Sequence, residues 1–272
     1  MHKSIKKGIK FIIGVGIVGA FLAPFFLMVF YSFQTRRQIF GDFNLFFNPT
    51  LDNYRELIYG DFFLNNLQSS VIVVIGSVIV GLLLAVPAAY GFARYNFRGK
   101  DDLAFWILSL RMVPPIAVVI PYFLIGSFVG LIDTHIILVI TFLTFNIPFA
   151  IWMLKGFFED IPVSLEEQAR VDGCSRFQAF RKIMLPLVAP GMGATAILIV
   201  IQSWNHFVYA LFLTSTQART LPTMVTRFLG FTGVAWGPMF AASFLATLPV
   251  VFFAVLFRKK LIQGLTFGAV KG

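Results

Sequence analysis

Long stretches without a charged residue are the feature that most constrains how this chain of 272 residues can fold. Five of them hold between 21 and 36 consecutive uncharged residues, and they lie at 11–35, 62–93, 134–154, 183–218 and 228–257. A sixth apolar stretch, about 103–131, is interrupted only by Arg111. A bilayer core about 30 Å thick requires roughly 20 apolar residues per helix, so each stretch is long enough to cross it. We therefore expect an all-α integral membrane protein with six transmembrane helices.

The composition agrees with this expectation and excludes an ordinary soluble domain. Hydrophobic residues make up 58% of the chain and charged residues 12%, whereas about a quarter of the residues in soluble domains are charged. The single cysteine, Cys174, excludes an internal disulfide and is expected to fill a small packing position. The basic N-terminal segment and its apolar run resemble a signal peptide, but the run has full span length and five more follow. We expect an uncleaved first helix.

The distribution of Lys and Arg predicts the side of the membrane that each loop faces. Sixteen of the 22 basic residues lie in the N-terminal segment, the turn after the second span, the segment 155–182 and the C-terminal tail, and five lie in the alternate loops. Cytoplasmic loops carry the excess of Lys and Arg, so both termini and the segment 155–182 should face the cytoplasm. This topology also explains the net charge of +10, which therefore gives no support to nucleic-acid binding.

The expected spans differ in how regular they should be. Their approximate limits are 11–33, 66–93, 103–131, 134–155, 188–213 and 235–257. Pro87 in the second span is tolerable in lipid if neighbouring helices satisfy the freed carbonyl. In the third span Arg111 is followed by Pro114, Pro115 and Pro121, so this span must kink or break, and it is the only span expected to do so. The outer loop 34–64 should contain a short helix that begins at Leu51 or Asp52.

One internal segment, 159–186, is much more polar than the rest of the chain. It holds nine of the 34 charged residues within 24 positions. Ser164 and Glu167 have the spacing of a capping box that starts a helix. Gly173 suits the left-handed residue that ends this first helix. A second helix should then begin at another possible box, formed by Ser175 and Gln178.

The two short helices of this segment favour docking to another protein. Leu165, Ala169 and Asp172 share one face of the first helix, with the small Ala169 at its centre. The second helix carries an apolar stripe of Phe177, Phe180 and Met184. A small residue among carboxylates would let a short helix seat closely in a groove of a cytoplasmic protein. The alternative, an amphipathic loop on the lipid headgroups, stays open, although the anionic inner leaflet would repel an acidic helix.

The same segment resembles the coupling loop of membrane permease subunits of bacterial ABC importers. The pattern is E-A-A, three residues, G, nine residues, I-x-L-P, and it is matched by Glu167, Ala169, Gly173, Ile183, Leu185 and Pro186. Gln168 departs from it, because the family has its first Ala there. The stretches AAYGFARYNFRGK (88–100), FNIPFAIWMLKGFFEDIP (145–162), SWNHF (203–207) and QGLTFGAVKG (263–272) resemble the carbohydrate-uptake branch.

This resemblance implies a fold and a set of partners. The fold would be that of a type I ABC importer permease, with one permease domain over 1–272, core helices within 66–257 and a coupling loop at 159–186. The chain is similar to the shorter, six-span partner of the maltose/trehalose/polyol-type permease pair in the bacterial cytoplasmic membrane. Such a subunit works with a second permease, two ATP-binding subunits and an extracytoplasmic sugar-binding protein, and moves a sugar or sugar alcohol. ATP and Mg would be bound by the ATPase subunits, so this chain would need no cofactor or metal and would not itself be an enzyme.

The resemblance also assigns residues to the contact with the ATPase. They are Glu166, Glu167, Gln168, Ala169, Asp172, Gly173 and Arg176. Glu167 would pair with a basic residue of the ATPase, and Gly173 would set the angle between the two short helices. The terminal residues 264–272 would either reach back to this contact or form a disordered tail.

A second group of residues is a candidate lining for the translocation path. It comprises Arg111, Asn146, Trp204, Asn205 and His206. Arg111 lies about 13 Å along its span at 1.5 Å per residue, and a charge at the bilayer centre costs roughly 2.5–3.5 kcal/mol. It therefore needs either a polar pore or a polar partner on a neighbouring helix, and both interpretations stay open. The same holds for Asn146, Asn205 and His206, and His206 replaces a Glu that is frequent in relatives.

Other classes of membrane protein are less consistent with the sequence. A secondary transporter driven by an ion gradient would be expected to show inverted repeats with broken helices in both halves, and no such repeat is evident. An intramembrane metalloenzyme would need clustered ligands, but the three histidines are scattered and HExxH is absent. The P-loop motif is also absent, so energy from ATP would have to come from another chain. The sequence does not identify the sugar.

Overall fold

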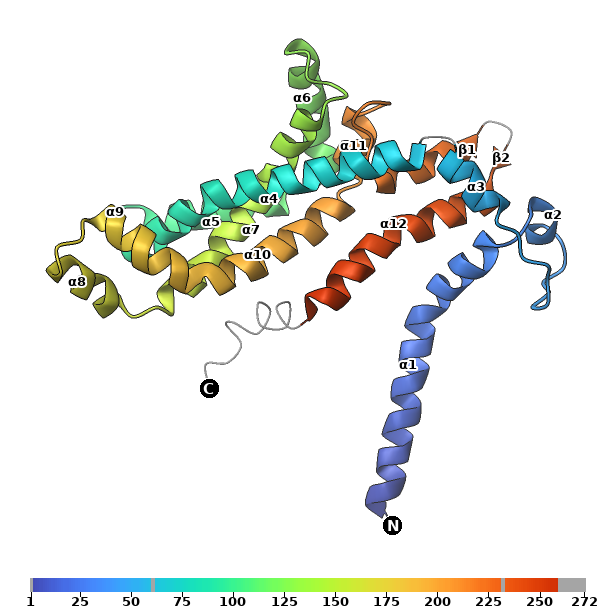
Figure 1. Ribbon diagram of the computed structural model, residues 1–272, viewed down its shortest axis with the longest axis horizontal. Helices are drawn as coiled ribbons and strands as arrows, with labels where there is room; N and C mark the ends of the chain where they lie inside the picture. Colours follow the sequence, from blue (N-terminus) through green and yellow to red (C-terminus); the bar gives the residue numbers. More distant parts are fainter. Residues whose placement is uncertain (1, 60–61, 231–232, 259–272) are drawn as a thin grey trace. The chain divides into compact units, whose positions relative to one another are not determined.

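The computed structural model is helical over most of its length and describes residues 2–59, 62–230 and 233–258 (Figure 1). Within these residues, five helical segments are long and apolar enough to cross a membrane, and a bent pair of helices supplies a sixth crossing if it counts as one span. The five segments include α1 (His2–Ser32), α4 (Phe62–Arg94), α7 (His135–Glu159), α10 (Leu185–Asn205) and α12 (Trp236–Leu256). The predicted all-helical membrane fold is therefore confirmed. Lys259, Lys260, Lys271 and the terminal motif lie outside the described residues.

The chain forms two compact units, which are described separately. The first comprises Met1–Leu64 and Met224–Pro249, and the second comprises Asn65–Thr223 and Val250–Gly272. In the first unit the outer end of α1 is followed by α2 (Arg36–Ile39) and α3 (Asp52–Tyr59), and a short hairpin of β1 (Leu229–Gly230) and β2 (Gly233–Val234) precedes α12. The helix expected from Leu51 or Asp52 is confirmed as α3. The single permease domain stays a prediction.

A buried asparagine closes the outer loop of the first unit onto the end of α1. Asn53 of α3 donates hydrogen bonds to the carbonyls of Ser32 (2.8 Å) and Gln34 (2.9 Å). Gly237 at the start of α12 packs directly on this side chain, because a Cβ there would lie 2.6 Å from Asn53 Oδ1. The ring of Tyr31 stacks on Phe240 of α12, with centroids 5.5 Å apart. These contacts fix the backbone at the exit of α1.

The second unit is built on α4, α7 and α10, with α5 (Lys100–Ser109) beside them (Figure 1). Its apolar side chains form two buried clusters, one that includes Ala89, Phe158 and Met184 and one that includes Phe142. Gly191 permits the close approach of α10 to α7, because a Cβ there would lie 2.5 Å from the ring of Phe157. Pro87 lies inside an uninterrupted α4, as the sequence predicted.

The predicted break in the third span is confirmed. After α5 the chain makes a 3₁₀ turn, η1 (Leu110–Met112), and then continues as α6 (Pro115–Phe128), which is bent by 92° from the preceding helix. Pro114 lies between the two helices with φ −65° and ψ 133°, which is an extended conformation. Consecutive prolines remove two backbone donors and disfavour the α conformation of the residue before each of them, which explains the break.

A second break falls where the sequence predicted a continuous span. Instead of one helix over 188–213, α10 ends at Asn205 and α11 (Val208–Leu213) begins after His206 and Phe207. His206 is extended, with φ −70° and ψ 100°. The Asn205 side chain donates to the carbonyl of Ile201 (2.9 Å), so a polar side chain competes with the backbone ladder at this point. The expectation that only the third span is broken is wrong.

Candidate functional site

The cytoplasmic segment forms two short helices joined at a glycine, as the sequence predicted. They are α8 (Val163–Val171) and α9 (Arg176–Ala179), and α9 continues through a π-helical turn, η2 (Phe180–Met184), into α10. Gly173 has φ +90°, the left-handed conformation expected of it. The N–H of Cys174 bonds to the carbonyl of Ala169 (2.9 Å) and that of Gly173 to Arg170 (3.1 Å), which is a Schellman motif. The end of α8 is thus rigidly defined.

Only one of the two predicted capping boxes forms. Ser175 accepts from the N–H of Gln178, and the Gln178 side chain accepts from the N–H of Ser175, so the second box is confirmed. The box of Ser164 and Glu167 is wrong. Helix α8 begins at Val163 with Pro162 as its N-cap, so Ser164 lies inside the first turn and cannot cap it.

Glu166 attaches α8 to the cytoplasmic end of α4. The Tyr90 hydroxyl donates to Glu166 Oε1 (2.5 Å), and Arg94 Nε lies 3.5 Å from Glu166 Oε2. Arg94 also donates from Nη2 to the carbonyl of Ile161 (2.6 Å). The side chains of Arg94 and Glu166 are only 6% and 12% exposed. Their Nε and Oε2 atoms have no hydrogen-bond partner among the described residues, so this ion pair is the interaction that compensates both buried atoms.

The exposed face of α8 differs from the expected one. Ala169 is 4% exposed, so the prediction that it lies at the centre of an accessible face is wrong. The reason is that Ala169 is one turn from Glu166, and both face the body of the second unit. The accessible face instead carries Glu167, Gln168 and Val171, and the Val171 side chain is 88% exposed.

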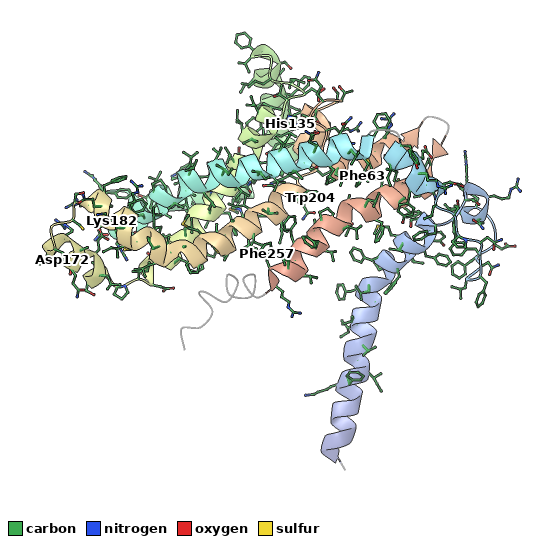
Figure 2. The ribbon with its side chains drawn as sticks, viewed as in Figure 1. Phe63, His135, Asp172, Lys182, Trp204 and Phe257 are labelled. Carbon is green, nitrogen blue, oxygen red and sulfur yellow. The ribbon has the colours of Figure 1, made fainter. Side chains whose placement is uncertain are left out.

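The remaining residues of this segment divide between the surface and the core. Asp172 and Arg176 are exposed, and Figure 2 shows Asp172 at the same end of the unit as Lys182. Of the apolar stripe expected on the second helix, Met184 is fully buried and Phe180 packs on the ring of Tyr90, 4.7 Å between centroids. Phe177 is exposed. The role of all these residues at an ATPase stays a prediction.

Sequence reasoning missed three residues that build this site: Tyr90, Arg94 and Val171. Tyr90 and Arg94 are spaced i, i+4 at the cytoplasmic end of α4, so they lie on one face of that helix. This spacing of a hydroxyl and a guanidinium at the end of an apolar span was the available signal. Val171 could have been found only as an apolar residue on the side of α8 opposite Glu166.

The candidate translocation residues gather near the break between α10 and α11. Arg111 donates from Nη2 to Gln202 Oε1 of α10 (3.2 Å), and its guanidinium lies 4.9 Å from the centroid of the Phe149 ring. Gln202 is thus the polar partner that the sequence required and could not identify. Arg111 is nevertheless exposed, so a polar partner and an accessible position coexist.

Asn146 and His206 are more buried than Arg111. Asn146 is fully buried and donates from Nδ2 to Ser203 Oγ (2.8 Å), which ties α7 to α10. The His206 ring lies against Phe142, with centroids 4.8 Å apart. Asn146 Oδ1 and His206 Nε2 are buried and have no hydrogen-bond partner within the described part of the chain. Trp204 is buried while Asn205 is exposed, so the structure does not bring these two to one surface.

At the opposite end of the second unit Asp133 organises the outer turn. Its carboxylate accepts hydrogen bonds from the backbone N–H groups of four consecutive residues, 215–218, at 2.9–3.3 Å. The hydroxyls of Ser215 and Thr216 add two more. Burial tends to raise the pKa of Asp133, but these hydrogen bonds outweigh it and hold the pKa well below its usual range. Asp133 itself has φ +60°, a left-handed conformation that Asp tolerates.

Five to six candidate spans among the described residues, with a polar segment packed at one end of them, define the architecture of a multi-pass membrane protein. Residues 77–266 match the family model described as binding-protein-dependent transport system inner membrane component, and the chain belongs to that family. It is therefore an inner-membrane permease subunit, and the ATPase of such a transporter is a separate subunit.

Individual relatives support this assignment over most of the chain. The chain is 40% identical over 225 residues to the probable ABC transporter permease protein y4oR of Sinorhizobium fredii, covering 83% of this chain and 81% of that protein. It is 39% identical to the trehalose transport system permease protein SugB of Mycobacterium tuberculosis, covering 82% of each. It is 33% identical to the trehalose/maltose transport system permease protein MalG of Thermococcus litoralis over the full length of both.

A solved structure shows the same fold. A chain of a bacterial ABC transporter involved in the import of the acidic polysaccharide alginate superposes with a TM-score of 0.78. The match covers 95% of this chain and 98% of that chain at 21% identity. The expected ABC importer permease fold is thereby confirmed.

Proposed function

We propose that this chain forms, with a second permease, the membrane pathway of an importer for a sugar or sugar alcohol. The class of substrate is supported by the relatives, whose names include trehalose, trehalose/maltose and diacetylchitobiose permeases. Two ATP-binding subunits and an extracytoplasmic sugar-binding protein would complete the assembly. The binding protein follows from the family, and the sugar and the subunit composition are the parts proposed here.

The observation that carries this proposal is the attachment of α8 to the transmembrane helices. A lever between an ATPase and the membrane must be rigid and must keep an accessible face. Glu166 attaches α8 to α4 through Tyr90 and Arg94, and the Schellman motif at Gly173 fixes the end of α8. The opposite face leaves Glu167 accessible, and its carboxylate has no hydrogen bond or ion pair among the described residues.

Movement of an ATPase subunit would then reach the membrane by two routes. One runs from α8 through Glu166 to α4. The other runs through α9 and η2, whose Met184 is fully buried in the same cluster as Phe158 of α7. Because α10 follows η2 without interruption, a displacement of the cytoplasmic segment would move α10 and the polar residues near its end. Arg111 and Asn205, both exposed there, are the members of the candidate path that a solute could contact directly.

The proposal is tested first on the assembled transporter. The chain is purified with its co-expressed partners, reconstituted in liposomes and supplied with ATP, the binding protein and a panel of sugars and polyols. We expect ATP hydrolysis and uptake to be stimulated by one of these solutes. Uptake by the chain alone, driven by an ion gradient, would contradict the proposal.

The role of α8 is tested with a charge reversal. We expect Glu167→Lys to reduce uptake at least tenfold while the ATPase subunits still bind ATP, because the accessible carboxylate would be replaced by a repelling cation. The control is Asp160→Lys, which makes the same change of charge on an exposed residue of the same segment outside α8. Equal effects of the two variants would remove Glu167 from the coupling contact.

A second pair of variants tests the geometry of the lever at Gly173. Gly173→Pro cannot adopt φ +90°, because proline is fixed near −65°. It should abolish uptake, whereas Gly173→Asn, which tolerates the left-handed conformation, should retain most of it. Normal uptake by the proline variant would contradict the assignment.

A further inference from the structure

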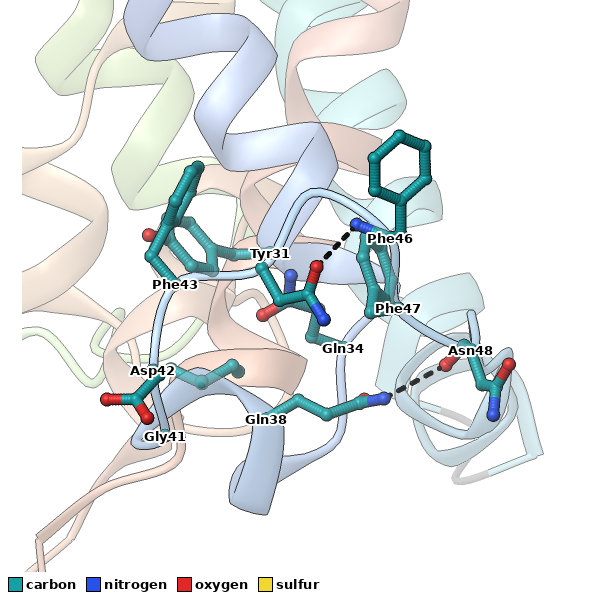
Figure 3. A pocket seen from close by; sticks show the side chains of 11 residues that line it. Tyr31, Gln34, Gln38, Gly41, Asp42, Phe43, Phe46, Phe47 and Asn48 are labelled. Atoms are coloured by element: carbon teal, nitrogen blue, oxygen red, sulfur yellow. Dashed lines mark hydrogen bonds between the residues drawn. The ribbon is translucent and has the colours of Figure 1, made fainter.

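We propose that the outer loop of the first unit contains a binding pocket for a neutral saccharide, between the end of α1 and residue 48 (Figure 3). The pocket has a volume of about 340 Å³ and is lined entirely by residues of this loop and of the end of α1. Pockets that hold small molecules have volumes of roughly 300–1,000 Å³, so this one suits a small ligand. The pattern of Lys and Arg places it on the outer side of the membrane.

A largely covered glutamine whose amide makes no hydrogen bond and opens to the pocket is the observation that points to a ligand. Gln34 lines the pocket and is only 3% exposed, yet its side-chain amide has no hydrogen-bond partner among the described residues. Neither polar atom of this amide is sealed from solvent, so the amide opens to the pocket and a ligand could replace the water that reaches it. The backbone of Gln34 is fixed, since its N–H bonds to Tyr31 (3.1 Å) and its carbonyl accepts from Asn53. The amide is therefore held in place before a ligand arrives.

The other side-chain amides of the pocket differ in whether they already form hydrogen bonds within the protein. Gln38 is occupied, because it accepts from Thr35 (2.8 Å) and donates to the carbonyl of Asn48 (3.2 Å). Asn44 uses its carbonyl oxygen to accept from the N–H of Phe46 (2.9 Å), which leaves its NH₂ group available. The Asn48 side-chain amide is exposed and makes no hydrogen bond among the described residues. Gln34 and Asn44 therefore each contribute to the lining an amide that is not fully used within the protein.

Aromatic rings supply the apolar surface of the same pocket. Tyr31, Phe43, Phe46 and Phe47 are among its lining residues. Phe43 and Phe47 both pack on Phe30, with centroids 5.8 Å and 4.9 Å apart, so these two rings are supported from behind. Phe46 is 91% exposed and makes no such contact with them. A ring that lines the pocket and is this accessible could cover a ligand after a change of its side-chain rotamer.

The chemistry of the lining favours a neutral saccharide over other small molecules. A pyranose ring presents C–H groups on its faces and hydroxyls around its edge, which match aromatic rings and amides respectively. The lining contains no Lys or Arg that would hold an anion. Asp42 is its one carboxylate, and a carboxylate accepts hydrogen bonds from sugar hydroxyls as readily as it pairs with a cation.

This inference rests on the proposed function, because it places a sugar contact on the surface where the solute would arrive. It goes beyond that function, since the site lies in the loop after α1 and uses none of the residues of the candidate translocation path. A solute retained there would be bound before it enters the membrane pathway.

The test measures saccharide binding by the full-length chain in lipid nanodiscs, using saturation-transfer difference NMR with maltose, trehalose and sorbitol. We expect signal from at least one of them and none from tetramethylammonium or acetate at the same concentration. Phe46→Ala should weaken binding about fivefold or more, because it removes one aromatic face. Gln34→Leu should weaken it by a similar factor by removing the buried amide.

Two further measurements separate the possible outcomes. Tyr59→Ala is the matched control, because Tyr59 is 83% exposed on α3 and does not line the pocket; it should bind like the parent. Asn48→Leu changes an exposed residue and replaces Gln34→Leu if that variant does not fold. Absence of binding, unchanged binding in Phe46→Ala, or saturation transfer from tetramethylammonium alone would overturn the pocket. If the assembled transporter still takes up a sugar in that case, only this inference fails, whereas absence of sugar uptake would refute the proposed function itself.

Discussion

At the cytoplasmic end of the second unit Glu166 is held by two side chains, whereas at the outer end Asp133 is held by the backbone. Glu166 accepts from the Tyr90 hydroxyl and pairs with Arg94, both on α4. Asp133 accepts from the four N–H groups of 215–218 and from two hydroxyls. Each carboxylate holds one connecting segment in place. The two ends therefore differ in the kind of partner that the carboxylate binds.

This difference indicates which of the two connecting segments can move as a rigid body. Four backbone donors of one turn converge on Asp133, so the turn at 215–218 can leave it only by breaking all of these hydrogen bonds together. Side-chain partners can rotate, and α8 is internally complete without Glu166, since the Schellman motif ends it independently. We therefore expect α8 to keep its own shape and to move α4 through Glu166, with the side chains at that contact adjusting, and the outer turn to stay fixed. The following predictions test this contrast, from the largest expected effect to the smallest.

Removal of the buried cation should have the largest effect. Arg94→Leu leaves Glu166, whose side chain is 12% exposed, with Tyr90 as its remaining partner. Breaking a buried ion pair from one side typically costs 3–5 kcal/mol, so we expect the free energy of unfolding to fall by about 3 kcal/mol. Denaturant titration in detergent micelles measures it.

The matched control for this variant removes both charges. Arg94→Leu combined with Glu166→Leu leaves no isolated buried charge, so it should be more stable than Arg94→Leu alone. If the double variant is less stable than the single one, the cost does not come from the unpaired carboxylate.

Loss of the outer carboxylate should have the second largest effect. We expect Asp133→Ala to lower the free energy of unfolding by about 2 kcal/mol, because several hydrogen bonds to a charged group are lost but water can reach the exposed donors. Asp133→Asn should cost less, since Asn tolerates the left-handed conformation and retains one acceptor oxygen. An equal cost for both variants would show that backbone conformation contributes little at this position.

The same residue predicts a pH dependence. The pKa of Asp133 is lowered in the folded protein, so its contribution to stability is fully present above the unfolded value of about 3.9. This contribution is lost as the pH falls through the lower, folded pKa. The stability difference between the parent and Asp133→Asn should therefore be constant from pH 5 to 8 and shrink only below about pH 4. A difference that shrinks near pH 6 would contradict the lowered pKa.

How much of these two ends can be predicted from the sequence depends on how far apart along the chain the interacting residues lie. The Gly173 turn, the box at Ser175 and the break after Pro114 depend on residues that are near in sequence, and all three are present. The apolar stretches likewise determine the spans, because the requirement for about 20 apolar residues is local. The capping box predicted at Ser164 was a local error, because the helix already begins at Val163, directly after Pro162.

The contacts between distant segments could not be predicted in this way. Glu166 and Tyr90 are 76 positions apart, and Arg111 and Gln202 are 91 positions apart. Which face of α8 is buried depends on Glu166 reaching α4, so Ala169 was placed on the wrong side. The break at His206 carries no Pro or Gly, and the backbone of Gln34 at the pocket is held by Asn53, which lies 19 positions away.

Tyr90→Phe should have an intermediate effect. The substitution removes the 2.5 Å hydrogen bond to Glu166 but keeps the aromatic packing of Tyr90 on Phe158 and Phe180. A hydrogen bond to a charged group contributes roughly 1.5–3 kcal/mol, and we expect the lower end because Arg94 still pairs with the carboxylate. Thermal unfolding in nanodiscs measures the loss. A loss below about 0.5 kcal/mol would show that Arg94 alone holds Glu166.

Ser215→Ala should have the smallest effect, and it sharpens the contrast with Tyr90→Phe. Both substitutions delete one hydroxyl that donates to a carboxylate, at 2.8 Å from Ser215 and 2.5 Å from Tyr90. Asp133 keeps its four backbone donors, and Ser215 is exposed, so the loss should be about 0.5 kcal/mol or less. The comparison is therefore expressed by the ratio of the two losses in the free energy of unfolding, measured under the same denaturing conditions. If Ser215→Ala costs as much as Tyr90→Phe, the backbone donors do not carry the outer attachment, and the outer turn would be as free to move as α8.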